Sequence, residues 1–307
     1  FADATGASLD ELSTLEGVTE TAKRYYEWTD SLTPDIPDDG KAFYGRDSMA
    51  NYFVIAMKQM GKEIFEVKDG DVTINTDKEL IKRIWDNYYV PYIEGYFAAY
   101  GKFRSDDVKT KDILAYTGSA SSALYFPDAI ESNNESYPID FIIQEPPVMD
   151  GGDDYKVQQG AGMAVTKSDE EHEYASCVFL KWFTEKEQNL RFVCASAYLP
   201  VTNDANSVKA LDKVIKDYSI EINDKAYECL VNVMDNFNSD LLYTTKNFSN
   251  GYSLRKILEY NLSDKAAEDK TAIDEAIAAG VSRDEVLSQY TTDEAFENWY
   301  NQFCDAL

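Results

Sequence analysis

Histidine is nearly absent from this sequence, which limits the chemistry that the chain can perform. The one histidine, His172, lies in the acidic run 169–173. A Ser-His-Asp triad would have to use it, and an imidazole-based metal site would have too few ligands. We therefore predict that His172 lies on a solvent-exposed helix face. GxSxG, HExxH and P-loop motifs are also missing, so the sequence indicates no catalytic residue, no metal site and no cofactor.

Cysteine is scarce and widely spaced. The four cysteines form no CxxC pair, which excludes the common zinc and redox motifs. Cys177 and Cys194 fall on or beside apolar helical faces, which predicts buried free thiols. Spacing alone assigns no disulfide among Cys177, Cys194, Cys229 and Cys304.

Basic residues are heavily outnumbered. The chain has 29 Lys and Arg against 56 Asp and Glu, which gives a formal net charge of −27. A surface this negative repels phosphate backbones and anionic lipid headgroups, so nucleic acid is excluded as a partner. The same charge disfavours an anionic ligand and favours a neutral or cationic one.

Long hydrophobic runs are missing as well. No segment approaches the roughly 20 apolar residues that span a bilayer, and residues 1–4 do not resemble the start of a signal peptide. Nevertheless, 44% of the residues are hydrophobic and 13% are aromatic. This content is sufficient for a packed core and predicts a globular protein.

Amphipathic helices and one hairpin are predicted in the first quarter of the chain. Thr14 is the predicted N-cap of a helix over 15–32, and a second helix is predicted over 48–60. Residues 63–67 and 72–74 have a strand-like pattern on either side of an Asp-Gly turn, which predicts a β-hairpin.

The middle of the chain mixes helical and extended patterns. Thr76 and Glu79 form a capping box that predicts the start of a helix, which Pro91 should end or kink. Short apolar runs predict strands at 113–116 and 141–143.

Two further capping boxes begin at Ser168 and Thr184 and predict two consecutive helices. We expect the first to bury Tyr174, Val178 and Trp182, which recur at helical spacing.

The sequence predicts helical structure after the Tyr-Leu-Pro segment at 198–200, as far as the end of the chain. Trp85 and Trp299 lie on apolar helical stripes and are expected in the core. Scattered short strands separated by helices indicate an α/β layered fold whose C-terminal third is entirely helical.

Residues 157–201 carry an ordered set of features. A glycine-rich segment ending in Lys-Ser leads to a helix with the sequence Phe-Leu-Lys-Trp-Phe at 179–183, and Tyr-Leu-Pro-Val follows at 198–201. This order resembles the family 1 extracellular solute-binding proteins of ABC importers, the maltose-binding-protein-like group. The flanking segments that agree with the family in order are 10–16, 45–61 and 112–127.

The resemblance implies a periplasmic-binding-protein-like fold of type II, with two α/β lobes that close around a solute. Members extend further at the N-terminus, so we expect an N-terminally truncated chain that is mostly the second lobe with part of the first. The implied organisation is 1–157 as the first part of the second lobe, 158–202 as an excursion into the first lobe, and 203–307 as the C-terminal helical part of the second lobe.

The resemblance also implies a function. It predicts an extracellular receptor, not an enzyme, that captures a carbohydrate, an oligosaccharide, and delivers it to ABC transporter permease subunits. We expect a monomer on the cell surface as a lipoprotein, or in the periplasm, that contacts the membrane only through a lipid anchor lost with the N-terminus.

A sugar site needs flat aromatic rings for C–H faces and fixed polar groups for hydroxyl edges. Candidates for these roles follow from their places in the chain and from the resemblance. They are Arg46, Asp47, Ser119, Ser121, Ser122, Tyr125, Tyr198 and Tyr252. Several also have a structural alternative: N-capping for Asp47, a plain turn for the serines, and core packing for Tyr125.

Two other functions stay open at this point. An extracellular carbohydrate-active enzyme would place two cleft carboxyl groups roughly 5 to 10 Å apart. A helical interaction domain without a small ligand would instead expose a large apolar patch.

Overall fold

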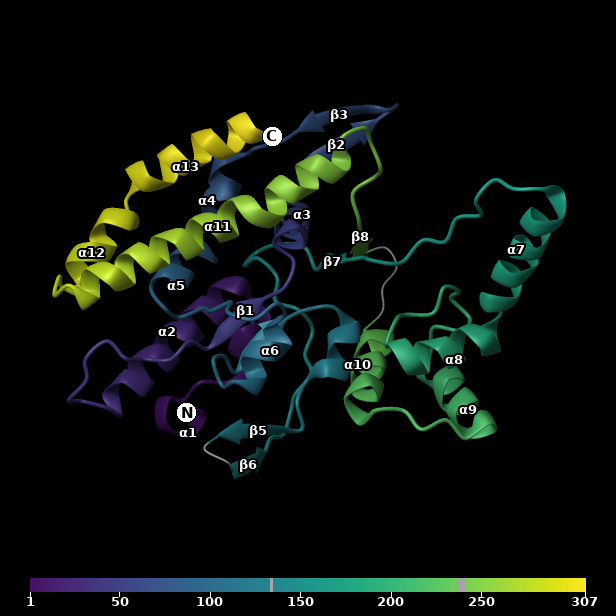
Figure 1. Ribbon diagram of the computed structural model, residues 1–307, viewed down its shortest axis with the longest axis horizontal. Coiled ribbons are helices and arrows are strands. Elements are labelled where there is room, and N and C mark those ends of the chain that lie inside the picture. The colour runs from purple at the N-terminus through teal and green to yellow at the C-terminus, as the bar shows by residue number, and fades with distance from the viewer. Residues whose placement is uncertain (133–134, 237–240) are drawn as a thin grey trace.

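The computed structural model describes residues 1–132, 135–236 and 241–307. Figure 1 shows a larger part and, on the right of the view, a smaller part that contains the helices between residues 170 and 235. We call the described residues up to 157 and from 241 onward the body, and residues 158–236 the limb.

The N-terminal half of the body alternates short helices with very short strands. Its elements, with η for a 3₁₀ helix, are α1 (Ala2–Thr5), η1 (Leu9–Ser13), α2 (Leu15–Ser31), β1 (Tyr44–Arg46), α3 (Met49–Gln59), β2 (Phe65–Lys68), β3 (Asp71–Ile74), α4 (Lys78–Asp86), α5 (Tyr89–Ile93), α6 (Arg104–Lys109), β4 (Ala115–Thr117), η2 (Ala120–Tyr125), β5 (Ala129–Ser132), β6 (Glu135–Pro138) and β7 (Lys156–Val157).

The limb is helical, and the body resumes after it. The limb contains α7 (Glu170–Phe183), α8 (Lys186–Ser196), α9 (Val208–Tyr218) and α10 (Asp224–Asp235). The body then adds β8 (Leu242–Tyr243), α11 (Gly251–Ala278), α12 (Arg283–Tyr290) and α13 (Asp293–Ala306). The long helix α11 crosses the body beside α3 and α5 (Figure 1).

The core of the body joins helices from both ends of the chain. The ring centroids of Trp85 on α4 and Trp299 on α13 are 4.9 Å apart. Phe53 of α3 stacks on Phe303 at 5.3 Å. All four side chains are at most 3% exposed. Trp85 and Trp299 are therefore core residues, as their apolar stripes predict.

The β-structure of the body consists of short pairs of strands. β1 and β4 are parallel, and Arg46 is in register with Thr117. β2 and β3 form the predicted antiparallel hairpin. β5 and β6 form a second hairpin. β7 and β8 pair in parallel where the chain leaves the body and returns to it, so the two crossings to the limb lie side by side.

The limb has a small core of its own. Leu190 and Val193 of α8 pack with Leu211 of α9 and Leu230 of α10, and all four are fully buried. α9 and α10 follow residue 202 in the chain, yet they share this core with α8. The lobe boundaries at 157 and 202 stay predictions.

α7 differs from the sequence-based expectation. Its apolar residues do not pack into the limb core: Tyr174 is 72% exposed, Val178 50% and Trp182 47%. The predicted burial of these three side chains is therefore wrong. Cys177 of the same helix is exposed, whereas Cys194 is buried. Periodicity found the apolar face correctly, but no described element covers it.

Several predicted boundaries move by a residue or more. The N-cap of α4 is Asp77, which accepts the N–H of Leu80, and the N-cap of α7 is Asp169, which accepts the N–H of His172. In both cases a second capping residue directly follows the predicted one and takes the role. The helix that Pro91 should end or kink breaks before α5, because the proline ring clashes with the carbonyl four residues earlier.

Two strand predictions also change. The strand expected at 113–116 is β4, displaced to 115–117. The strand expected at 141–143 does not form, and Ile142 is 67% exposed. The architecture is therefore a helix-rich α/β fold with small sheets. Among the described residues, no helix is both long enough and apolar enough to cross a membrane.

Candidate functional site

The predicted polar residues of the body meet at one edge of the β1–β4 pair. Because the strands are parallel and Arg46 is opposite Thr117, the segments after them emerge at the same edge. The N–H of Asp47 donates to the carbonyl of Thr117 at 2.9 Å. A Cβ atom at Gly118 would lie 2.9 Å from Oγ of Ser122 and 3.1 Å from Oδ2 of Asp47, so a larger residue at this junction would have to displace both side chains.

Asp47 is held by Arg104 of α6. Its Oδ1 accepts the backbone N–H of Arg104 at 3.1 Å and lies 3.6 Å from Nε of the same residue. Burial raises the pKa of the Asp47 carboxyl above its ordinary value, although Arg104 opposes the shift. The guanidinium of Arg104 also pairs with Asp107 at 2.5 Å. Asp47 therefore fixes the loop between β1 and α3.

Asp47 does not cap α3. The N-cap is Ser48, which adopts a left-handed conformation with φ 55° and makes no side-chain cap bond. The carboxylate of Glu259 on α11 takes the place of a local cap, because it accepts the N–H of Ala50 at 2.9 Å and the hydroxyl of Ser48 at 3.3 Å. The proposed N-capping role of Asp47 is therefore wrong, and a distant helix supplies the acceptor.

The serine segment forms the 3₁₀ helix η2 and is more than a plain turn. Ser119 and Ser121 share a hydrogen bond of 2.8 Å between their hydroxyls, and Ser122 donates to the carbonyl of Ser119 at 2.6 Å. The thiol of Cys229 on α10 lies 3.7 Å from the carbonyl of Ala120. η2 therefore lies at the junction between the body and the limb.

The three candidate tyrosines are all exposed and belong to three different segments of the chain. Tyr125, at the end of η2, is 63% exposed, so core packing is not its role. Tyr198 follows α8 on the limb and meets Phe192 edge-on at 5.9 Å. Tyr252 is in the first turn of α11, with Nζ of Lys256 4.7 Å from its ring. In the described part of the chain, no hydrogen bond or ring contact joins Tyr198 or Tyr252 to the β1–β4 edge.

A second polar cluster, centred on Asn51 of α3, was not among the sequence candidates. Oδ1 of Asn51 accepts from Arg255 of α11 and, at 3.2 Å, from Gln159 on the outgoing crossing. Asn51 is only 9% exposed. The signal in the sequence is a single amide in the apolar run 49–57. Its partners are too far away in the chain to be found from spacing.

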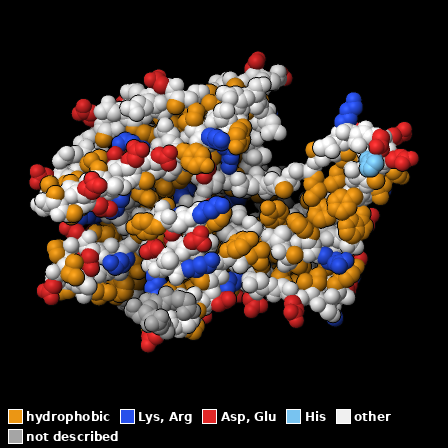
Figure 2. Space-filling model, viewed as in Figure 1, with side chains coloured by type: hydrophobic (Ala, Val, Ile, Leu, Met, Phe, Trp, Pro, Cys, Tyr) orange, Lys and Arg blue, Asp and Glu red, His pale blue; other side chains and the backbone are white. Residues whose placement is uncertain are grey.

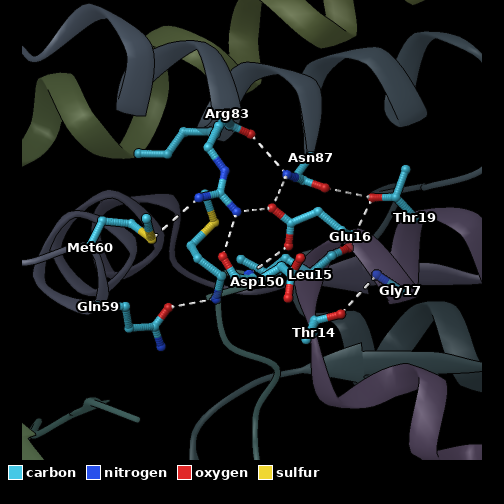
Figure 3. Close-up of polar contacts among 12 residues, drawn as sticks. Thr14, Leu15, Glu16, Gly17, Thr19, Gln59, Met60, Arg83, Asn87 and Asp150 are labelled. Carbon is cyan, nitrogen blue, oxygen red and sulfur yellow. Dashed lines mark hydrogen bonds and ion pairs between the residues drawn. The ribbon is translucent and has the colours of Figure 1, made fainter. Parts of the chain in front are cut away.

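Figure 3 shows how the chain is anchored just before the outgoing crossing. Glu16 of α2 accepts a hydrogen bond from Arg83 of α4, one from Asn87 at 3.3 Å, and the N–H of Asp150 at 2.9 Å. Arg83 also donates to the carbonyl of Asp150 at 2.9 Å. Burial raises the pKa of the Glu16 carboxyl, but the Arg83 and Asp150 hydrogen bonds outweigh it and hold that pKa below its ordinary value.

Gln59 of α3 continues this anchor toward the limb. Its Oε1 accepts the N–H of Met149 at 3.0 Å, its Nε2 donates to the carbonyl of Tyr155 at 2.9 Å, and its carbonyl accepts the N–H of Asp153 at 2.8 Å. Gln59 is 4% exposed. One buried amide thus fastens residues 149–155 to the body directly before β7.

The space-filling view shows what lies between the two parts. Figure 2 shows a deep notch between the body and the end of the limb that carries α7, with hydrophobic side chains along the limb. Among the described residues, no three His, Cys, Asp or Glu side chains gather in a way that could hold a metal ion.

Comparison with known proteins identifies the family. The profile described as "Bacterial extracellular solute-binding protein" matches residues 1–220, which include all of the body before the limb and the limb as far as α9. No curated protein matches the chain. Because the profile covers more than half of the sequence, the chain belongs to the bacterial extracellular solute-binding proteins, the non-catalytic receptors that deliver solutes to ABC importers.

Proposed function

We propose that this receptor binds a carbohydrate, an oligosaccharide, at the body face of the notch between body and limb, and delivers it to ABC permease subunits. The supporting observation is the meeting of Arg46, Asp47 and the serine segment 119–122 at the carboxyl edge of β1 and β4. That edge lies beside η2, where the body meets the limb, and ligands of open α/β sheets bind at such edges.

The eight sequence candidates have different parts in this proposal. Arg46, Asp47, Ser119, Ser121 and Ser122 provide or position polar groups. Tyr125 and Tyr252 are exposed rings of the body, and Tyr198 belongs to the limb. Closure of a type II binding-protein fold would bring the limb ring toward the body. Attachment to the cell surface as a lipoprotein, and a monomeric state, are part of the same proposal.

The test is a binding screen with a broad panel of mono- and oligosaccharides, followed by intrinsic fluorescence and by calorimetry. We expect saturable binding of at least one sugar, with a fluorescence change. Gly118→Val should lose at least tenfold in affinity, because the new side chain would displace Asp47 and Ser122. Gly162→Val is the control, since no atom lies within 4 Å of the Cβ position at that residue. Absence of binding across the panel would reject the proposal.

A ligand-free interaction domain is the second candidate function, and one observation favours it. The exposed face of α7, formed by Tyr174, Val178, Phe179 and Trp182, is an apolar surface of the kind that partner proteins cover. A sugar screen without binding, together with capture of purified permease subunits by the chain alone, would favour this alternative.

A further inference from the structure

Arg46 is a cation without a counter-charge. Its guanidinium carbon lies 3.9 Å from the centre of the Tyr52 ring. Its Nε is buried and has no hydrogen-bond partner. No ion pair within the described ranges includes this side chain, and its two terminal nitrogens are not among the buried unpaired atoms. The stacking on Tyr52 therefore fixes the plane of the guanidinium and leaves its outer edge free to bind.

Arg255 reaches the same end of α3 from another direction. It hydrogen-bonds to the amide oxygen of Asn51, the residue next to Tyr52. This partner is neutral, and no ion pair with a described carboxylate accompanies it. Lys256 follows directly and lies over the Tyr252 ring, 4.7 Å from its centre. Three cationic side chains thus lie around the first turns of α3 and α11.

The carboxylates of this region are occupied elsewhere. Glu259 accepts hydrogen bonds from Ser48 and from the N–H of Ala50 at the start of α3. Asp47 forms an ion pair with Arg104, and Arg104 also pairs with Asp107. By contrast, Arg24 and Arg83 each have a glutamate partner. Arg191 and Arg283 also form no ion pair among the described residues, and they contact neutral groups. What distinguishes Arg46 is therefore its place at the candidate site, its stacking on Tyr52 and its buried Nε without a hydrogen-bond partner.

We infer that the solute of this receptor is an acidic sugar, a uronic acid or an oligosaccharide that contains one, whose carboxylate is bound by Arg46 with the help of Arg255. This inference rests on the proposed function. A planar guanidinium binds a carboxylate through two parallel N–H bonds, and Arg46 is held in one plane by Tyr52. A single negative charge also suits a protein whose overall field opposes anions, because a dianionic phosphate would be repelled more strongly.

The local charge around Arg46 differs from the overall charge of the protein. The net charge of −27 opposes any anion at long range, but salt screens such a field within about 10 Å. At contact distance the local side chains decide, and there Arg46, Arg255 and Lys256 lack carboxylate partners among the described residues. The negative surface then serves selectivity, since it admits only anions that match the arginines.

The experiment compares acidic sugars with neutral isosteres. Calorimetry would measure binding of disaccharides of galacturonate, glucuronate and mannuronate, each beside its methyl ester, and of a panel of neutral disaccharides. We expect one acid to bind at least tenfold more tightly than its ester. Arg46→Gln should remove this preference, and Arg46→Lys should restore part of it, because the charge returns without the planar fork.

Arg191→Gln is the matched control. Arg191 lies on the limb beside Gln188 and Tyr218, away from the candidate site, so its variant should keep the preference for the acid. If neutral sugars bind and no acid binds more tightly than its ester, the inference is overturned while the proposed function stands. If neither panel binds, both fail. The comparison of acid with ester on the unaltered chain decides the question even if Arg46→Gln does not fold.

Discussion

The body and the limb are built in different ways. The body core joins residues far apart in the chain, such as Trp85 with Trp299 and Phe53 with Phe303. The limb core consists mainly of aliphatic side chains from three consecutive helices. The body is therefore stabilised by long-range contacts that form together, whereas the limb is a small local unit. The two parts are joined through β7 and β8, through the contact of η2 with α10, and through the ion pair of Lys225 on α10 with Asp128 of the body.

The largest expected effect is in the body core. Trp299→Ala removes a ring that is 3% exposed and contacts three other aromatic rings, so we expect a loss of about 3–5 kcal/mol of unfolding free energy. Urea denaturation followed by circular dichroism would measure it. The matched change Trp182→Ala, at an exposed position on α7, should stay within about 0.5 kcal/mol. Equal losses would contradict the contrast between the two tryptophans.

A change in the limb core should have a smaller and more local effect. Leu211→Ala leaves a cavity among Leu190, Val193 and Leu230, and we expect a loss of about 2–3 kcal/mol. Hydrogen exchange should show lower protection in the limb helices and unchanged protection in α3. If α3 loses protection equally, the two parts unfold as one unit and the comparison fails.

The stabilisation that Glu16 provides through Arg83 and Asp150 should depend on pH. Glu16→Gln weakens the hydrogen bonds from Arg83 and Asp150, at a cost of about 1 kcal/mol near pH 7 for a partly exposed group. The pKa of Glu16 is held below its usual 4.5, so its stabilisation is complete above that pH and is lost as the pH falls below it. Unfolding curves of both proteins should converge in acid. A constant difference from about pH 7 to about pH 3 would exclude the charge as the cause.

The smallest effect concerns the thiols. Cys177 on α7 is exposed, whereas burial raises the pKa of Cys194 and of Cys229. Since the thiolate is the reactive form, a thiol reagent at about pH 8 should label Cys177 well before these two. Cys177→Ser should remove the fast phase without changing stability. A fast phase that persists in Cys177→Ser would show that another thiol is accessible.

Local patterns in the sequence predicted local structure well. Thr14 caps α2 and accepts the N–H of Gly17 as expected, and the hairpin around Asp69 and Gly70 forms in its predicted place. Each of these depends on neighbours within a few residues. The errors at Asp77 and Asp169 arose where two capping residues are adjacent and the sequence cannot choose between them.

The exposure of α7 and the geometry of the site depend on partners that spacing does not reveal. A helical stripe shows which side of a helix is apolar, but it does not show whether another element packs against that side. Trp182, on the apolar side of α7, is 47% exposed. The meeting of Arg46 with Thr117 requires parallel pairing of strands that are distant in the chain. The contact of Asn51 with Arg255 joins positions separated by 204. Arg46 itself was a candidate because the sequence placed it at the start of a predicted helix, whereas in the structure it is the last residue of β1.

The side-by-side placement of β7 and β8 has a mechanical consequence. Two parallel segments joined over two residue pairs form a narrow strap, and a narrow strap twists more readily than it stretches. Because the amide of Gln59 clamps the chain at 149 and 155, such torsion would be confined to the few bonds beyond that clamp. A swing of the limb would then leave both hydrophobic interiors unchanged and would strain mainly the contacts of α10 with the body, which are those with η2 and the ion pair of Lys225 with Asp128.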